Sequence, residues 1–144
     1  MSVDKLKQVY HTLGVEQIGG RQHYLRYDVS VTPKLWDDNG FTYDSSLGFA
    51  DRAGFRCGVC YEYTMYDLIN RETLKVKQRP LVAMDCSIIS SNYEGLGYTE
   101  KSLERFKLLK DRCKHFDGDF TLLWHNSFFG NKESKAFYLG LISK

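Results

Sequence analysis

Three short runs of polar side chains have the residue types that acid–base chemistry requires. The run His125–Ser127 follows an apolar stretch, and the other two are Arg21–Tyr24 and Asp44–Ser46. Asp85 is a fourth candidate, inside an expected strand that begins with the four apolar residues 81–84. An imidazole exchanges protons near neutral pH, a carboxylate beside it stabilises the imidazolium, and a guanidinium binds anions through its planar fork. These residue types predict proton transfer next to an anion-binding group.

The elements that must position these side chains alternate between helices and strands. The N-terminal segment is amphipathic, with Ser2 as its cap and Gly14 as its stop. The stretch 50–79 is rich in Gly, Cys and Tyr and is expected to be irregular. Apolar spacing and capping residues predict helices over 2–13, 32–39, 99–116 and 132–144, and strands around 15–20 and over 41–43, 81–89 and 120–126.

This alternation is typical of an α/β fold with mostly parallel strands and flanking helices. In such folds functional residues gather beyond the carboxyl ends of the strands. The polar runs fall at expected strand ends, so we expect them to form a site. Two alternatives stay open: Asp44–Ser46 is an ordinary turn whose side chains bond the backbone, and His125 is a hydrogen-bonded core histidine.

Composition limits the classes of function. The chain has 144 residues, 42% of them hydrophobic, which suits a single domain over residues 1–144. The net charge of +2 is too small for a general nucleic-acid-binding module, and no apolar run is long enough to span a membrane. The N-terminus lacks the apolar centre of a signal peptide, so a cytoplasmic location is expected.

The four cysteines do not form a recognisable metal motif. Cys57 and Cys60 make one C-x-x-C pair, whereas a structural zinc site normally needs a second pair, which Cys86 and Cys113 do not supply. A redox dithiol would need a thioredoxin-like context that is missing here. Free thiols that are partly buried are the better interpretation.

Three segments together resemble a known family. "GRQHYLRYD", "YDSSLGFADRAGFRCG" and "FTLLWHNS" resemble, in this order, the C-terminal half of a polysaccharide deacetylase-like (NodB-homology, carbohydrate esterase) domain. The resemblance covers most of the chain. It implies a partial (β/α) barrel and a hydrolase of carbohydrate metabolism that removes acyl groups from a sugar with the help of a divalent metal, zinc or similar.

The resemblance also implies roles for individual residues. His125 matches the general acid, and Arg21 would orient a carboxylate or an oxyanion. Asp85 or Asp44 would hold the imidazole protonated. His23, which stands where the family usually has proline, is either a ligand or a substrate contact. The remaining substrate-binding candidates are Tyr24, Asp44, Arg52 and Trp124.

Two of these candidates have a plain structural alternative. Strand alternation places Trp124 and His125 on opposite faces, which favours core packing over sugar stacking for the tryptophan. Arg52 and Arg56 lie near glycines that let a backbone approach a ligand, so they either grip an anion or are simply solvated.

The chain departs from the family pattern ahead of Arg21. It has no Asp-Asp segment there and no His-x-x-x-His segment anywhere, so the base and the metal ligands are not found in this sequence. The expected function is therefore a hydrolase segment that is incomplete as this chain alone. The alternative is a non-catalytic carbohydrate-binding or interaction domain. Open sheet edges of a half-barrel predict a partner, either a missing N-terminal half or a second copy.

Overall fold

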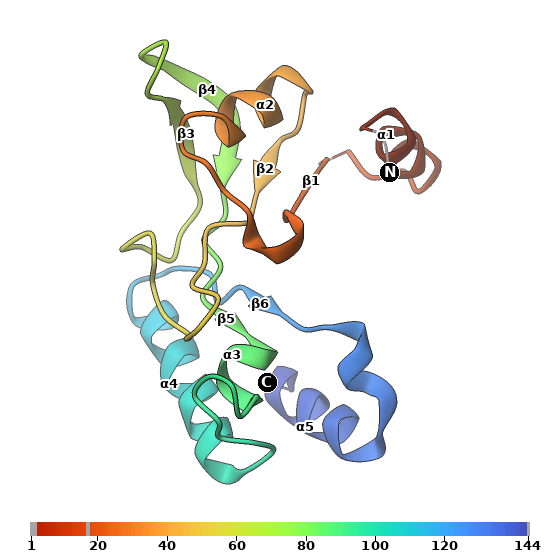
Figure 1. Cartoon of the computed structure of the whole chain (residues 1–144), viewed down its shortest axis with the longest axis vertical. Coiled ribbons are helices and arrows are strands. Elements are labelled where there is room, and N and C mark those ends of the chain that lie inside the picture. Colours follow the sequence, from red (N-terminus) through yellow and green to blue (C-terminus); the bar gives the residue numbers. More distant parts are fainter. Residues whose placement is uncertain (1–2, 17, 144) are drawn as a thin grey trace. The chain divides into compact units, whose positions relative to one another are not determined.

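The computed structural model describes residues 3–16 and 18–143 and has a mixed α/β fold (Figure 1). The chain divides into two compact units. Unit 1 comprises Met1–Leu47 and Glu62–Arg79, and unit 2 comprises Gly48–Tyr61 and Pro80–Lys144. A single domain over the whole chain stays a prediction.

Unit 1 is built around a four-stranded sheet in the order β1-β2-β4-β3. Strand β1 pairs with β2 and β2 with β4 in parallel, whereas β3 and β4 form an antiparallel hairpin. The elements are α1 (Val3–Thr12), β1 (Gly19–Gly20), η1 (His23–Leu25), α2 (Thr32–Asp38), β2 (Tyr43–Asp44), β3 (Tyr63–Asp67) and β4 (Glu72–Gln78).

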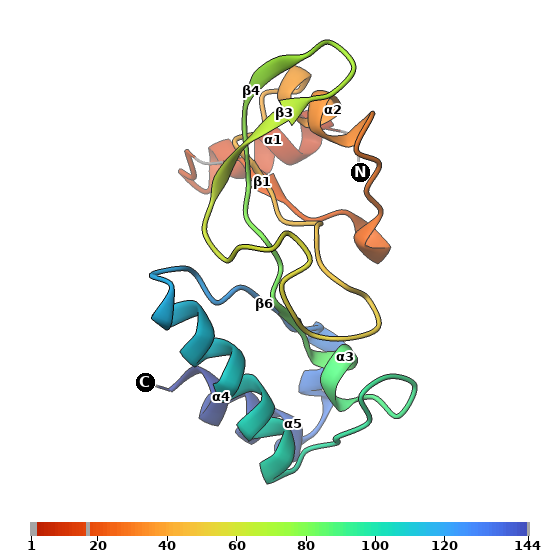
Figure 2. The same cartoon turned by 90° about the vertical axis from the view of Figure 1, so that its left-hand side faces the viewer.

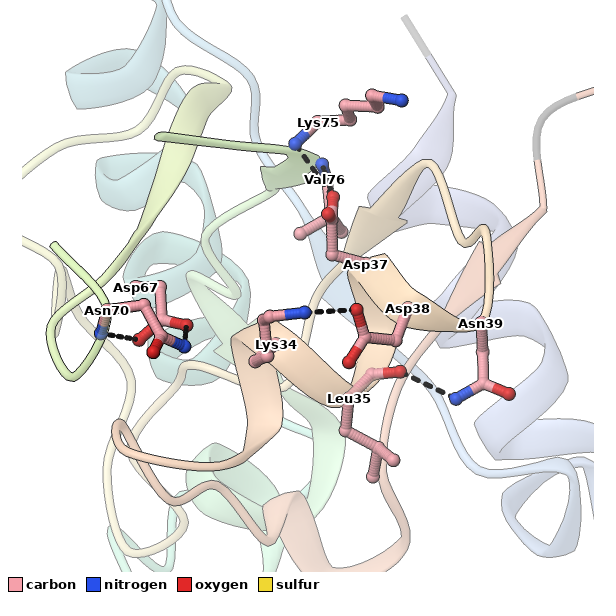
Figure 3. A network of polar contacts seen from close by, with 9 residues as sticks. All are labelled: Lys34, Leu35, Asp37, Asp38, Asn39, Asp67, Asn70, Lys75 and Val76. Atoms are coloured by element: carbon pink, nitrogen blue, oxygen red, sulfur yellow. Dashed lines mark hydrogen bonds and ion pairs between the residues drawn. The ribbon is translucent and has the colours of Figure 1, made fainter. Parts of the chain in front are cut away.

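Helix α2 is fastened to the sheet by one carboxylate. Asp37 accepts hydrogen bonds from the backbone N–H groups of Lys75 and Val76 in β4, at 2.7 and 2.9 Å (Figure 3). Beneath this contact lies a core whose buried members are Trp36, Phe41, Met65, Leu74 and Val76. The bonds and the apolar face together hold α2 against β4.

Unit 2 places two short parallel strands beside helices. Strand β5 (Ala83–Met84) pairs with β6 (Leu122–Leu123), and Met84 lies opposite Leu123. The long helix α4 packs against both α3 and α5 (Figure 2). The remaining elements are α3 (Asp85–Ile89), α4 (Glu100–His115), η2 (Asn126–Gly130) and α5 (Lys132–Ile142).

The core of unit 2 explains why α4 forms where the sequence predicts it. Phe106, Leu109 and Cys113 are buried on one face of the helix, at the three- and four-residue steps of an amphipathic pattern. Thr99 is the N-cap, and its backbone N–H donates to the Ser102 hydroxyl at 3.1 Å. The helix predicted over 99–116 is confirmed, because α4 covers Glu100–His115.

The expected α/β class with mostly parallel strands is confirmed, and two local predictions are wrong. The stretch 50–79 is not irregular throughout, because it contains the β3–β4 hairpin. The strand expected over 81–89 ends at Met84, where α3 begins. Ser2, the expected first cap, lies outside the described residues.

Within residues 3–16 and 18–143 the strands form no closed barrel. In the same ranges, no helix combines the length and the apolar character needed to cross a bilayer.

Candidate functional site

The backbone of unit 2 brings Asp85 and His125 together. Asp85 directly follows β5, and His125 comes two positions after β6. Because β5 and β6 are parallel neighbours, with Met84 opposite Leu123, their carboxyl ends meet at one edge of the small sheet. The sequence predicts His125 near a strand end and Asp85 inside a strand, whereas the structure places both residues just beyond the ends of two parallel strands.

Two short contacts join His125 to the Asp85 carboxylate. His125 Nδ1 lies 2.6 Å from Asp85 Oδ1, and the backbone N–H of His125 donates to Asp85 Oδ2 at 2.5 Å. A carboxylate can only accept, so Nδ1 carries the proton of the first bond. Asp85 Oδ1 also accepts from the backbone N–H of Cys86 at 2.6 Å. Three donors therefore hold this carboxylate in one orientation.

The two partners differ sharply in exposure. The Asp85 side chain is 0% exposed, whereas 43% of the His125 side chain is exposed. Since Asp85 occupies Nδ1, the other ring nitrogen, Nε2, is not engaged by this carboxylate. A buried carboxylate that orients a half-exposed imidazole is an arrangement that moves one proton to or from a bound molecule.

Asp85, Cys86 and His125 are also the only group of three metal-ligating side chains found within the described residues. The group does not fit a resident divalent metal. Ligand atoms about 2.0–2.1 Å from a tetrahedral zinc lie roughly 3.3 Å apart, whereas His125 Nδ1 and Asp85 Oδ1 are 2.6 Å apart and hydrogen-bonded.

The third member of the group is equally unsuited to a metal. Burial, followed by the Asp85 charge, raises the pKa of the Cys86 thiol, which disfavours the thiolate that a metal needs. The geometry therefore describes a proton-transfer pair, and the metal implied by the sequence resemblance has no place in this cluster.

A second polar cluster lies at strand ends in unit 1. Arg21 follows β1 and Ser45 follows β2, and these strands pair in parallel with Gly20 opposite Asp44. The Arg21 fork donates to the Ser45 carbonyl through Nε at 2.7 Å and to the Ser45 hydroxyl through Nη2 at 2.9 Å. The guanidinium is thus fixed by a neighbouring strand end.

Asp44 is the buried centre of this second cluster. It accepts from the Ser46 hydroxyl at 2.6 Å and from the Ser46 backbone N–H at 2.9 Å. The Ser46 hydroxyl in turn accepts from the backbone N–H of Gln22 at 2.8 Å. Asp44 and Ser46 are both 0% exposed. The turn interpretation accounts for these contacts, because each side chain satisfies backbone groups of the loop.

Burial sets the proton affinities in this cluster. It raises the pKa of the Asp44 carboxyl, and the bonds from Ser46 and the charge of Arg21 offset only part of that rise. Burial likewise lowers the pKa of Arg21, against the opposing effect of Asp44. Loss of water disfavours both charged forms, and the Asp44 side chain is fully buried.

His23 and Tyr24 stand on an exposed corner of unit 1. Both residues are exposed, and Tyr24 is 78% exposed. Their rings are stacked at a tilt, with centroids 4.2 Å apart. Tyr24 and the next residue, Leu25, have positive φ angles of 59° and 51°. Such angles are costly for non-glycine residues, and here they turn the phenol outward.

Arg52 and Trp124, the last two candidates, have local partners. Arg52 is exposed, pairs with Asp51 at 3.0 Å and lies 4.0 Å over the Phe49 ring. Trp124 is surrounded by five aromatic rings, with centroids 5.1 to 6.5 Å away. The structure favours core packing for the tryptophan, as the strand alternation indicated.

The sequence reasoning missed two participants. Cys86 was considered only as a free thiol, although its place directly after Asp85 puts its backbone N–H on the carboxylate. Gln78, at the end of β4, is fully buried and donates to the Asp44 carbonyl at 3.0 Å. The alternation of buried positions along Leu74, Val76 and Gln78 was the signal that could have placed it.

No family model, curated protein or solved structure matches the chain.

Proposed function

We propose that this chain supplies the proton-transfer part of a polysaccharide deacetylase-like hydrolase, which removes acyl groups from a sugar. The proposed architecture is a partial barrel of that type, with the Asp85–His125 pair at its functional edge. The proposal rests on the three sequence segments that resemble the family and on one observation: a buried carboxylate that holds a half-exposed imidazole at parallel strand ends.

The pair suits the step in which the leaving group departs. When the tetrahedral intermediate collapses, the bond from carbon to the sugar nitrogen or oxygen breaks and its electron pair goes to the leaving atom. The proton that this atom needs comes from His125 Nε2, leaving a neutral imidazole. Asp85 keeps its bond to Nδ1–H throughout, which holds the ring in place and stabilises its charged form before transfer.

The other proposed residues would act on the substrate. Within unit 1, taken by itself, Arg21 is proposed to orient an anionic group, and the exposed His23 and Tyr24 are proposed to contact a sugar. A divalent metal of such a hydrolase would be held by residues outside the Asp85–Cys86–His125 cluster.

Acetate release tests this proposal. The protein is isolated from its source under native conditions, with any further segment or subunit that accompanies the chain, and is given N-acetylated chitooligosaccharides or O-acetylated xylan. We expect acetate release that falls about 10²- to 10⁴-fold in a His125→Ala variant, the usual contribution of a general acid. His115→Ala is the matched control, because His115 is an exposed histidine at the end of α4 and its loss should change nothing.

The result separates the two candidate functions. If His125→Ala leaves acetate release unchanged, the proton-transfer role is wrong. If no acetate is released but the oligosaccharides bind, and binding shifts the NMR signals of His23 or His125, the chain is a carbohydrate-binding domain instead. If the sugars neither react nor bind, both assignments fail.

A further inference from the structure

A separate hollow lies in unit 2, between the loop 53–61 and one face of α4. It has a volume of about 690 Å³, within the range of small-molecule sites. Its walls include Phe55, Val59 and Tyr61 from the loop, and Leu108 and Leu109 from the helix. None of the proposed site residues lines it.

The lining is apolar and part of it is open to solvent. Leu108, Tyr61 and Phe116 are 50%, 50% and 64% exposed, although all three are large apolar side chains on a shared surface. Leu109 forms the floor and is only 3% exposed. Covering a concave apolar patch of this kind with an apolar molecule removes it from water, which is favourable.

Two arginines give the hollow its charge. Arg105 and Arg112 are seven residues apart on α4, so they lie on the same face as Leu108 and Leu109. Arg105 is already committed to the wall: it donates to Glu94 Oε2 at 2.9 Å and to the Ala53 carbonyl at 3.0 Å. Glu94 in turn accepts from the backbone N–H of Ala53 at 2.9 Å. Arg105 and Glu94 therefore brace the loop against the helix.

Arg112 differs from Arg105 in having no side-chain partner within the described part of the chain. It is exposed at the rim, and no acidic residue is among the described side chains that line the hollow. The site thus combines an apolar concavity, a braced wall and one uncompensated positive charge.

We propose that this hollow binds a small amphipathic anion, with its apolar body against Leu108, Leu109 and Phe116 and its negative group at Arg112. The inference is independent of the proposed hydrolase function, because it uses different residues of unit 2. The positive rim charge selects for an anion, and the aromatic and aliphatic lining selects for a flat or elongated apolar body.

Two fluorescent probes with the same apolar body test the proposal on the full chain. One is 1-anilinonaphthalene-8-sulfonate, and the other is N-phenyl-1-naphthylamine, which lacks the sulfonate. We expect Arg112→Ala to weaken binding of the sulfonate about tenfold and to leave the uncharged probe within twofold. Leu108→Asp should weaken binding of both probes. Lys114→Ala, an equal charge change on the opposite side of α4, should affect neither.

Several results would overturn the site. One is an equal response of both probes to Arg112→Ala, and another is no response to Leu108→Asp. A third is a native dimer that Leu108→Asp converts to monomer, because the hollow would then be an interface between copies. Both side chains are exposed, so the variants should keep the wild-type circular dichroism and melting temperature. Lost probe binding in a variant that keeps both measures cannot be ascribed to unfolding.

Discussion

Each unit of this protein contains a fully buried aspartate at the end of a parallel strand. The two aspartates differ in the solvent exposure of the side chain to which each is hydrogen-bonded. Asp44 in unit 1 is bonded to Ser46, which is itself 0% exposed. Asp85 in unit 2 is bonded to His125, whose side chain is 43% exposed. The aspartate at the strand end is thus bonded to a buried side chain in unit 1 and to a half-exposed side chain in unit 2.

The difference shows how to separate structural from chemical carboxylates at strand ends. Asp44 satisfies its own loop, and its hydrogen bonds end on buried groups. Asp85 orients a ring that is 43% exposed to solvent. Burial of a carboxylate therefore does not distinguish a structural role from a chemical one. The solvent exposure of its hydrogen-bond partner does distinguish them.

Replacing Asp85 should have the largest effect on stability. Asp85→Ala removes the acceptor of three hydrogen bonds in a buried position and should lower the free energy of unfolding by about 2–4 kcal/mol. His125→Ala removes one of the three donors and leaves the two backbone donors to Asp85, so it should cost less, about 1–2 kcal/mol. Urea unfolding followed by tryptophan fluorescence measures both. Equal losses would mean that Asp85 serves only the histidine side chain.

Replacing Asp37 should have an intermediate effect on stability, as expected of a carboxylate with a structural role only. Asp37→Ala removes the acceptor of two backbone N–H groups of β4 and should lower the free energy of unfolding by about 1–2 kcal/mol. Asp38 is the matched control, because it lies next to Asp37 on α2 and forms only the exposed ion pair with Lys34 (Figure 3). Asp38→Ala should leave the urea midpoint unchanged, and a midpoint that fell as far as in Asp37→Ala would remove the distinction.

Asp44 should make unit 1 less stable as the pH rises. Burial raises the pKa of this carboxyl in the folded state, so its contribution is fully present below the unfolded pKa and is lost as pH rises through the folded one. Asp67 has the opposite sign: bonds from Asn70 lower its pKa, and its contribution is lost as pH falls.

The measurement is unfolding at several pH values for the wild type, Asp44→Asn and Asp67→Asn. The stability of the wild type relative to Asp44→Asn should fall between acid and neutral pH. Its stability relative to Asp67→Asn should rise over the same interval. Parallel curves for the wild type and Asp44→Asn would show that water reaches the Asp44 carboxyl.

Thiol labelling should give the smallest effect, a difference in rate alone. Burial and the neighbouring Cys60 raise the pKa of Cys113 to about 12, so its thiolate is scarce at pH 8. Burial and Asp85 also raise the pKa of Cys86, but Cys86 is only half-buried whereas Cys113 is buried. A maleimide should therefore modify Cys86 well before Cys113 in the native protein, as peptide mass mapping would show. Labelling of Cys113 first would place solvent in the core of unit 2 rather than at the pair.

The sequence was sufficient where one side of an element is apolar. The face of α4 follows from Phe106, Leu109 and Cys113, and the apolar run before His125 predicts a strand that ends close to it. The pairing itself was left open between Asp85 and Asp44, because spacing along the chain does not say which strands are neighbours.

Other features depend on contacts that the sequence does not display. The β3–β4 hairpin was missed because its turn has no Asn-Gly or Asp-Gly signal, and Arg71 instead takes a positive φ of 57°. The strand end at Met84 was missed because Cys86 to Ile89 are apolar enough to continue a strand. Arg105 bonds to Glu94, which is 11 residues away, and to the carbonyl of Ala53, which is 52 residues away. No local sequence pattern indicates contacts over such separations.

The protonation of the His125 ring tests the central claim most directly. Long-range ¹H–¹⁵N NMR of the native chain distinguishes the two ring nitrogens and the proton that each carries. The account predicts that neutral His125 carries its proton on Nδ1, hydrogen-bonded to Asp85, with Nε2 unprotonated and open to solvent. Asp85→Asn should abolish that preference. A neutral ring with its proton on Nε2, unchanged by Asp85→Asn, would contradict the account.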